Sequence, residues 1–147
     1  MGCENPDTET KLGINPGLGF GVEAGHPFFK EILEDYERSA FYKENGELNL
    51  YTIVERTTDL LKKYGVENTK EIQRVADITI YPSEYFCPIN MNTGKMERTA
   101  NTHSIHRYAA TWVSPKQRFR GKVYFLIVRL FGENFALKVR KILGKKS

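Results

Sequence analysis

The segment LGINPGLGFGVEAGHPFFKEILEDYERSAFY, from Leu12 to Tyr42, decides the fold class of this chain. Its first part, Leu12 to Val22, places glycines between apolar residues, which predicts an extended segment. Gly25-His26-Pro27 then opens a helix, because proline suits the first helical turn. From Phe28 to Tyr42 the apolar residues recur at helical spacing, which predicts an amphipathic helix. An extended segment followed at once by a helix indicates a mixed α/β chain.

Further helix and strand signals follow along the chain. After the Asn45-Gly46 turn, the apolar stripe from Leu50 to Tyr64 predicts a second helix, with Gly65 as its C-terminal cap. The segment from Ala76 to Tyr81 alternates in the manner of a strand, and Tyr85 to Ile89 is predicted to be a second short extended piece. The chain shows no internal repeat and no clear linker, and its 147 residues with 40% hydrophobic content match one ordinary domain.

The number and spacing of the cysteines indicate the cellular compartment of the protein. Cys3 and Cys87 are the only cysteines, so a disulfide framework is not expected, and their separation does not resemble a zinc knuckle. This usage fits a reducing setting, and we expect a cytoplasmic protein.

The charge of the chain is divided unevenly. Residues 115–147 hold ten Lys or Arg against one acid, Glu133, a net charge of +9, whereas residues 1–114 hold twelve basic and seventeen acidic side chains, a net charge of −5. We therefore divide the chain into a body, residues 1–114, and a basic tail, residues 115–147. The tail is predicted to form one helix or a pair of helices broken near Gly132.

Three interpretations of the basic tail are open. Its apolar side could pack on the body with its charges solvated, or it could lie along an anionic membrane surface and make the protein peripheral on the cytoplasmic membrane face. Its apolar run from Val123 to Val128 is far shorter than the ~20 residues that span a bilayer. Nucleic-acid binding is not favoured, because the acidic body would repel a duplex.

Histidine chemistry is concentrated in the segment from Thr102 to Trp112, which holds His103 and His106, two of the three histidines. Histidine titrates near neutral pH and is the commonest nitrogen ligand of divalent metals. In an extended segment the HxxH spacing puts the two rings on opposite faces, so only one of them can readily serve a given site. The plain alternative is that both are polar residues of a strand or its exit loop.

The glycine-rich run Gly17-Leu18-Gly19-Phe20-Gly21 is a second candidate site. Glycines let a backbone approach a ligand closely, but the run lacks the GxGxxG spacing into a helix of a dinucleotide site. A strand of small residues packed under a helix explains the run equally well. His26, beside Pro27, is most simply a residue that starts a helix.

Taken in order, these pieces resemble the C-terminal half of the DXD-containing sugar-binding glycosyltransferases. This family includes initiating α-1,6-mannosyltransferases and bacterial capsular-polysaccharide glycosyltransferases. The resemblance covers most of residues 12–112, and the His-to-Trp ending is also similar to that of lipopolysaccharide galactosyltransferases. It rests on the order of Ile14-Asn15-Pro16-Gly17-Leu18-Gly19-Phe20-Gly21, Gly25-His26-Pro27, Thr52-Ile53-Val54, Leu60-Leu61, Ile80-Tyr81-Pro82, Tyr85-Phe86, and His106 six residues before Trp112.

The resemblance implies a GT-A fold, of which residues 1–114 would form the C-terminal part. The Asp-x-Asp pair that holds a divalent cation on the donor diphosphate in this family does not occur in the sequence. Among the residues present, the resemblance implies His106 as a late ligand of Mn²⁺ or Mg²⁺. It also implies a sugar and acceptor pocket around Asn15, Gly17 and Gly19. Trp112 could stack on a sugar or base, or could belong to the core.

The expected activity is therefore metal-assisted transfer of a sugar from a nucleotide-sugar donor to a saccharide or lipid-linked acceptor in polysaccharide or glycan biosynthesis. We assign no catalytic base. Two other classes of function stay open: a noncatalytic accessory module that pairs with a chain supplying the Asp-x-Asp, and an adaptor that acts through its basic tail at a membrane surface.

Overall fold

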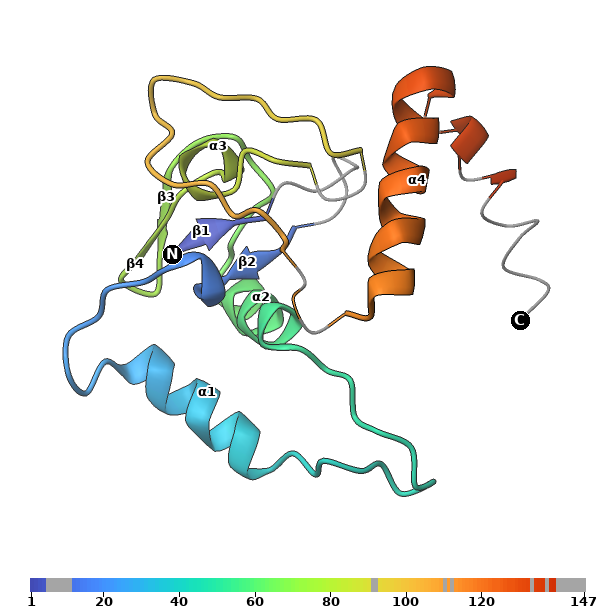
Figure 1. Cartoon of the computed structure of the whole chain (residues 1–147). Helices are drawn as coiled ribbons and strands as arrows, with labels where there is room; N and C mark the ends of the chain where they lie inside the picture. The colour runs from blue at the N-terminus through green and yellow to red at the C-terminus, as the bar shows by residue number, and fades with distance from the viewer. Residues whose placement is uncertain are drawn as a thin grey trace.

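A computed structural model describes residues 1–4, 12–90, 93–109, 111, 113–132, 134–136 and 138–139 (Figure 1). The chain is a mixture of helices and short strands. In order, the elements are β1 (Gly2–Cys3), β2 (Ile14–Asn15), the 3₁₀ turn η1 (Pro16–Leu18), α1 (Pro27–Glu37), α2 (Ile53–Lys63), β3 (Gln73–Val75), β4 (Ile78–Ile80), α3 (Ser83–Phe86) and α4 (Pro115–Phe131).

The strands form two small antiparallel pairs that backbone hydrogen bonds join at β1. In the first pair Gly2 faces Asn15, and in the second Val75 faces Ile78. Beyond the end of β4, Tyr81 forms a parallel bridge with Gly2. The Cys3 N–H donates to the Tyr81 carbonyl, and the Tyr81 N–H donates to the Met1 carbonyl, both at 2.9 Å. β1 therefore lies at the centre, between β2 and the chain that leaves β4.

Helices α1 and α2 build the core against this small sheet. α2 packs on β2, η1 and α1, while α3 packs on β1 (Figure 1). The buried side chains come from both strand pairs and both helices: Met1, Cys3, Ile14, Phe28, Ile32, Leu60, Leu61, Val66, Ile78 and Ile80. Leu61 and Ile14 are completely buried, so the contact of α2 with β2 lies inside the core.

Local signals explain the helix ends. His26 caps α1 by accepting from the Phe28 N–H, and Pro27 occupies the first turn, as predicted. In α2, Thr52 and Glu55 form a capping box, and the chain leaves the helix through Gly65 at φ +85°. Both predicted helices are therefore confirmed, although each is shorter than its apolar stripe.

Three predicted elements are wrong in detail. α1 ends at Glu37, so the exposed Phe41 and Tyr42 belong to a hairpin-like loop whose turn includes Gly46. The strand predicted over residues 76–81 is shorter, because Ala76 and Asp77 take positive φ and form the turn between β3 and β4. The extended piece predicted over residues 85–89 is wrong in its first part, where Tyr85 and Phe86 belong to the helical turn α3, whereas Ile89 forms an antiparallel bridge with Met96.

The long extended segment predicted over residues 12–22 is also wrong in its extent. Only Ile14–Asn15 pairs as a strand, and Pro16–Leu18 turns as η1. In the tail, α4 begins at Pro115 and ends before Gly132, which takes φ +80°, so the predicted break is confirmed. No helix within the described residues is long and apolar enough to cross a membrane.

Candidate functional site: the histidine segment, the glycine turn and an acidic cavity

Backbone carbonyls of α3 hold the histidine segment in place. The Tyr85 carbonyl accepts from the N–H groups of His103 at 2.9 Å and Ser104 at 3.2 Å, and the Phe86 carbonyl accepts from His106 N–H at 3.2 Å. Thr102 Oγ1 donates to the Glu84 carbonyl at 2.9 Å. The segment is therefore not a strand within the described residues, but its backbone is fixed by hydrogen bonds.

Phe86 connects this segment to the glycine turn. A Cβ placed on Gly2 would lie 2.8 Å from Phe86 Cδ2 and 3.3 Å from Leu18 Cδ1. Gly2 of β1 is thus packed closely between the Phe86 ring of α3 and the Leu18 side chain of η1. A larger residue at this position would force one of these neighbours to move. As a result, two parts of the chain lie at the same end of β1: the turn that contains Gly17 and Gly19, and the backbone of His106.

The two histidines of this segment have different surroundings. The His106 ring is exposed and lies 4.5 Å from the Tyr108 ring in an edge-to-face contact, and Tyr108 Oη is 2.9 Å from Cys87 Sγ. The His103 ring lies 5.9 Å from Tyr85 and 6.4 Å from Phe86. Both histidines are exposed, but they have different neighbours: the His103 ring lies beside the aromatic side chains of α3, and the His106 ring contacts Tyr108.

A divalent cation at His106 would need ligands from elsewhere. Among the residues that the structure describes, no group of three or more His, Cys, Asp or Glu side chains could hold a metal ion. An exposed imidazole can still supply one of several ligands. His106 thus fits the role of a single ligand, with phosphate oxygens and carboxylates needed to complete the shell of Mn²⁺ or Mg²⁺.

Asn15 shapes the glycine turn with both ends of its amide. Its Nδ2 donates to Glu4 Oε1 at 2.8 Å, and its Oδ1 accepts from Gly17 N–H at 2.6 Å. A Cβ on Gly17 would lie 2.8 Å from that same Oδ1, and Gly19 takes φ +119°. The buried Asn15 amide is therefore committed to the loop. The N–H groups of Gly17 and Gly19 are also bonded, to Asn15 Oδ1 and to the Pro16 carbonyl, so a ligand would have to use the other exposed main-chain atoms of these glycines. Trp112 lies outside the described residues.

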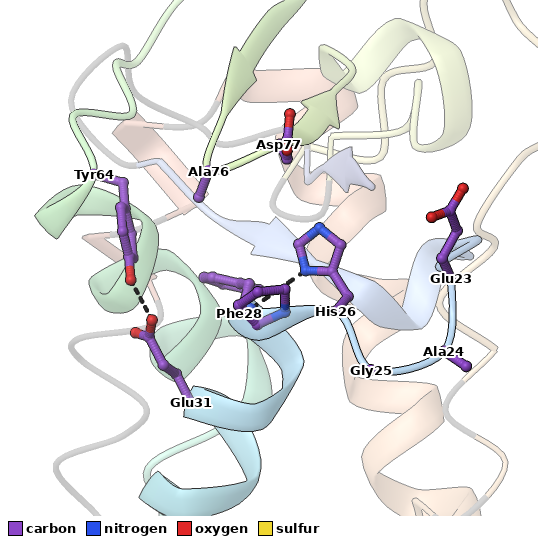
Figure 2. Close-up of a pocket in the computed structure, with 10 residues that line it drawn as sticks. Glu23, Ala24, Gly25, His26, Phe28, Glu31, Tyr64, Ala76 and Asp77 are labelled. Atoms are coloured by element: carbon purple, nitrogen blue, oxygen red, sulfur yellow. Dashed lines mark hydrogen bonds between the residues drawn. The ribbon is translucent and has the colours of Figure 1, made fainter.

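A cavity of about 550 Å³ opens at the N-terminus of α1 (Figure 2). Three carboxylates, one imidazole and one phenol line it. Tyr64 Oη donates to Glu31, and this hydrogen bond raises the pKa of Tyr64. Asp77 Oδ1 is 2.9 Å from the Arg74 guanidinium. The lining residues are Glu23, Ala24, Gly25, His26, Pro27, Phe28, Glu31, Tyr64, Ala76 and Asp77.

His26 has two roles in this cavity. Its Nδ1 accepts from the Phe28 N–H at 3.3 Å, which places the ring proton on Nε2. Figure 2 shows that second nitrogen on the side of the ring that faces Asp77. For His26 the sequence indicated only its role at the start of a helix. The cavity was not predicted, because Tyr64 and Asp77 are distant from His26 in the chain. The acidic Glu23, just before Gly25-His26-Pro27, was the one local sign of a polar site here.

No protein-family model, curated protein or solved structure matches this chain. The function therefore has to be argued from the residues and their geometry.

Proposed function

We propose that this chain forms part of a glycosyltransferase of the DXD-containing, GT-A type. It would help to move a sugar from a nucleotide-sugar donor to a saccharide or lipid-linked acceptor. One observation carries the proposal: Phe86 contacts the end of β1 beside Leu18 and holds the His106 backbone. The resemblance assigns the glycine turn and the histidine segment to one site, although Leu18 and His106 are 88 residues apart. Phe86 is a neighbour of both.

In this proposal His106 supplies one imidazole ligand to Mn²⁺ or Mg²⁺. The cation, when bound, would neutralise the negative charge that develops on the departing nucleoside diphosphate. His106 suits this role because its backbone is held by Phe86 while its ring is exposed. His103, whose ring packs on α3, is a positioning residue for the same segment.

The glycine turn would offer its backbone to the donor or acceptor. Gly17 and Gly19 expose main-chain groups that a side chain would partly cover. Asn15 would act through the turn, because both polar ends of its side chain already bind Glu4 and Gly17. Stacking of Trp112 on a sugar or base stays a prediction.

The cavity beside His26 suits the acceptor better than the donor. Carboxylates repel a nucleoside diphosphate but accept hydrogen bonds from sugar hydroxyls. The Glu23 carboxylate and His26 Nε2 make no hydrogen bond or ion pair with any residue that the structure describes, so both are available to a ligand. The ring of Tyr64 offers an apolar surface of the kind on which a sugar can pack.

The three histidines allow two parts of the proposal to be tested in one spectrum: the metal site at His106 and the acceptor site at His26. We would record ¹H–¹³C correlations of the imidazoles while adding MnCl₂ and UDP, and then a neutral disaccharide. Mn²⁺ with UDP should broaden the His106 signal more than those of His103 and His26, because paramagnetic broadening falls steeply with distance. The disaccharide should instead shift the His26 signal.

The variants His106→Ala and His103→Ala form a matched pair. His106→Ala should abolish nucleotide-dependent broadening at the remaining histidines, and in an active protein it should lower kcat/KM by roughly 100-fold or more. His103→Ala should stay within roughly threefold of the parent, because its ring packs on α3 and touches no ligand. Equal broadening of all three signals, or none with UDP present, would count against the proposal and favour a noncatalytic accessory module.

A further inference from the structure

Helix α4 has one side that packs and one that does not. On the packed side, Val128 is buried, and Gly121 and Tyr124 are half-buried. Phe125 on this side reaches the loop before the histidine segment, where its Cδ1 would lie 3.4 Å from a Cβ on Gly94. Phe125 therefore provides one contact of this side of α4 with the rest of the chain.

The other side of α4 carries an apolar stripe in solvent. Phe119, Val123, Leu126 and Leu130 follow the spacing i, i+4, i+7 and i+11, which places them on one face of a helix. Their exposed fractions are 68%, 39%, 55% and 64%. We call these four residues the α4 stripe. The one buried residue of α4, Val128, lies on the opposite face of the helix, so the stripe is not needed to bury it.

Cations border the α4 stripe along both edges. At 100° per residue, Lys116 and Arg120 fall on one side of it, and Arg118, Lys122 and Arg129 fall on the other. The helix contains no acidic residue from Pro115 to Phe131. An apolar stripe between two rows of cations is the pattern of helices that lie in the plane of an anionic membrane surface.

We propose that α4 docks its stripe onto an anionic lipid bilayer surface. The apolar side chains would enter the boundary between headgroups and acyl chains. The flanking cations other than Arg118, whose guanidinium donates to the Thr111 and Val113 carbonyls, would contact the lipid phosphates. The inference is independent of the proposed enzymatic function. If both are correct, the docked helix would also hold the acceptor cavity near a lipid-linked saccharide.

The helix is already formed for such docking. Ser114 and Gln117 make a capping box at its start, and Gly132 ends it with a positive φ. Binding therefore does not have to be coupled to helix formation, whose entropy cost would weaken it. Nucleic acid is the less suitable partner, because the aliphatic residues of the stripe provide no stacking surface for bases and the body is acidic.

Cosedimentation with vesicles tests the proposal on the whole chain. The probes are phosphatidylcholine vesicles with and without roughly 30 mol% phosphatidylglycerol. We expect binding to the anionic vesicles at least roughly tenfold tighter than to the neutral ones, and weakened as salt rises from about 0.1 to about 0.5 M. Equal binding to both vesicles, or none to either, would overturn the proposal.

Two variants separate the roles of the stripe and the cations. Phe119→Ser with Leu126→Ser should weaken binding to anionic vesicles by roughly tenfold or more, because it removes buried apolar area. Lys122→Glu with Arg129→Glu should remove the preference for phosphatidylglycerol. The matched control is Phe41→Ser with Leu50→Ser, which makes the same chemical change at residues 70% and 75% exposed in the loop between α1 and α2, and it should bind as the parent does.

Circular dichroism and thermal melting keep these results interpretable. All substituted side chains are exposed, so each variant should melt within about 3 °C of the parent. A folded Phe119→Ser, Leu126→Ser variant that binds anionic vesicles as tightly as the parent would refute docking through the stripe. Tight, salt-dependent binding to duplex DNA that survives this substitution would assign the tail to nucleic acid instead.

Discussion

At the scale of single residues, Cys3 shows how burial changes chemistry. Cys3 lies on the central strand β1 and is 8% exposed. Burial raises the pKa of its thiol from 9.0 to about 11, against the opposing effect of the Met1 ammonium. Below pH 9 the thiol is neutral in both the folded and the unfolded chain, so the raised pKa gives its full contribution to stability there.

This contribution should be lost as the pH rises from about 9 to about 11. A shift of two units corresponds to roughly 2 to 3 kcal/mol. We predict that the difference in unfolding free energy between the parent and Cys3→Ala is constant from pH 6 to about 8 and shrinks by that amount near pH 11. Urea unfolding at each pH measures it. A difference that stays constant through pH 11 would mean that the thiolate is solvated in the fold.

Asn15 and Gly17 show the limit of assigning a residue's role by resemblance. The resemblance to the glycosyltransferase family implied a sugar and acceptor pocket around these residues. The structure gives Asn15 a local structural function, because it caps η1 and binds Glu4. Gly17 is required in part because Asn15 Oδ1 occupies the place of its Cβ. Their predicted contact with a substrate is untested, and any such contact would use the backbone of the turn.

At the scale of elements, Arg56 joins the two core helices. Arg56 of α2 is 3% exposed, and its guanidinium lies 4.3 Å from the centre of the Tyr36 ring and 4.7 Å from that of Tyr51. It also forms an ion pair with Asp35 of α1. A planar guanidinium can stack on two rings and bind a carboxylate at once, which an ammonium cannot.

We predict that Arg56→Ala destabilises the chain by roughly 3 kcal/mol, because it leaves Asp35 unpaired and removes two ring contacts. Arg56→Lys should recover less than half of the loss. A double-mutant cycle with Asp35→Ala should give a coupling of about 1 kcal/mol or more.

Arg38 is the matched control for Arg56. Its guanidinium is 4.0 Å from Glu34, and its side chain is 69% exposed. Arg38→Ala should therefore change the free energy of unfolding by less than about 0.5 kcal/mol. An equal effect of the two substitutions would show that Arg56 acts only as a surface charge.

The capped helices were the best predicted elements. For α2, Gly65 was predicted at its C-terminal end, whereas the capping box of Thr52 and Glu55 at its start was found only in the structure. The β3–β4 turn and α3 were not predicted, because nothing local distinguishes Ala76-Asp77 from the alternating strand pattern that follows it. A positive φ at Ala76 is imposed by the pairing of Val75 with Ile78, which is a tertiary condition.

At the scale of the whole molecule, the body and the tail meet through few contacts. The described contacts of α4 with residues before Ser114 include Phe125 at Gly94 and the hydrogen bonds of Arg118 to the Thr111 and Val113 carbonyls. The core residues lie in α1, α2 and the strands. The division between residues 1–114 and 115–147 therefore predicts two parts of different stability.

We predict that a chain ending at Val113 melts within about 3 °C of the full chain and no longer binds anionic vesicles. Thermal unfolding followed by circular dichroism checks the first outcome. Leu61→Ala, at a completely buried position, is the contrasting variant and should cost about 2 to 5 kcal/mol. A truncated chain that loses cooperative unfolding would show that α4 contributes to the core.

Local patterns and composition predict the mixed α and β class, the two core helices, the break at Gly132 and the separation of charge. These properties depend on residues within about four positions of one another or on composition. Long-range packing is needed to pair β1 with Tyr81, to bring Arg56 against two rings, and to make His26 and Asp77 line one cavity. The physical reason is distance along the chain: the Met1 ammonium, for example, donates to a carbonyl 78 residues away. Strands of two or three residues carry too short a pattern to specify such partners, which packing against α2 and α3 selects.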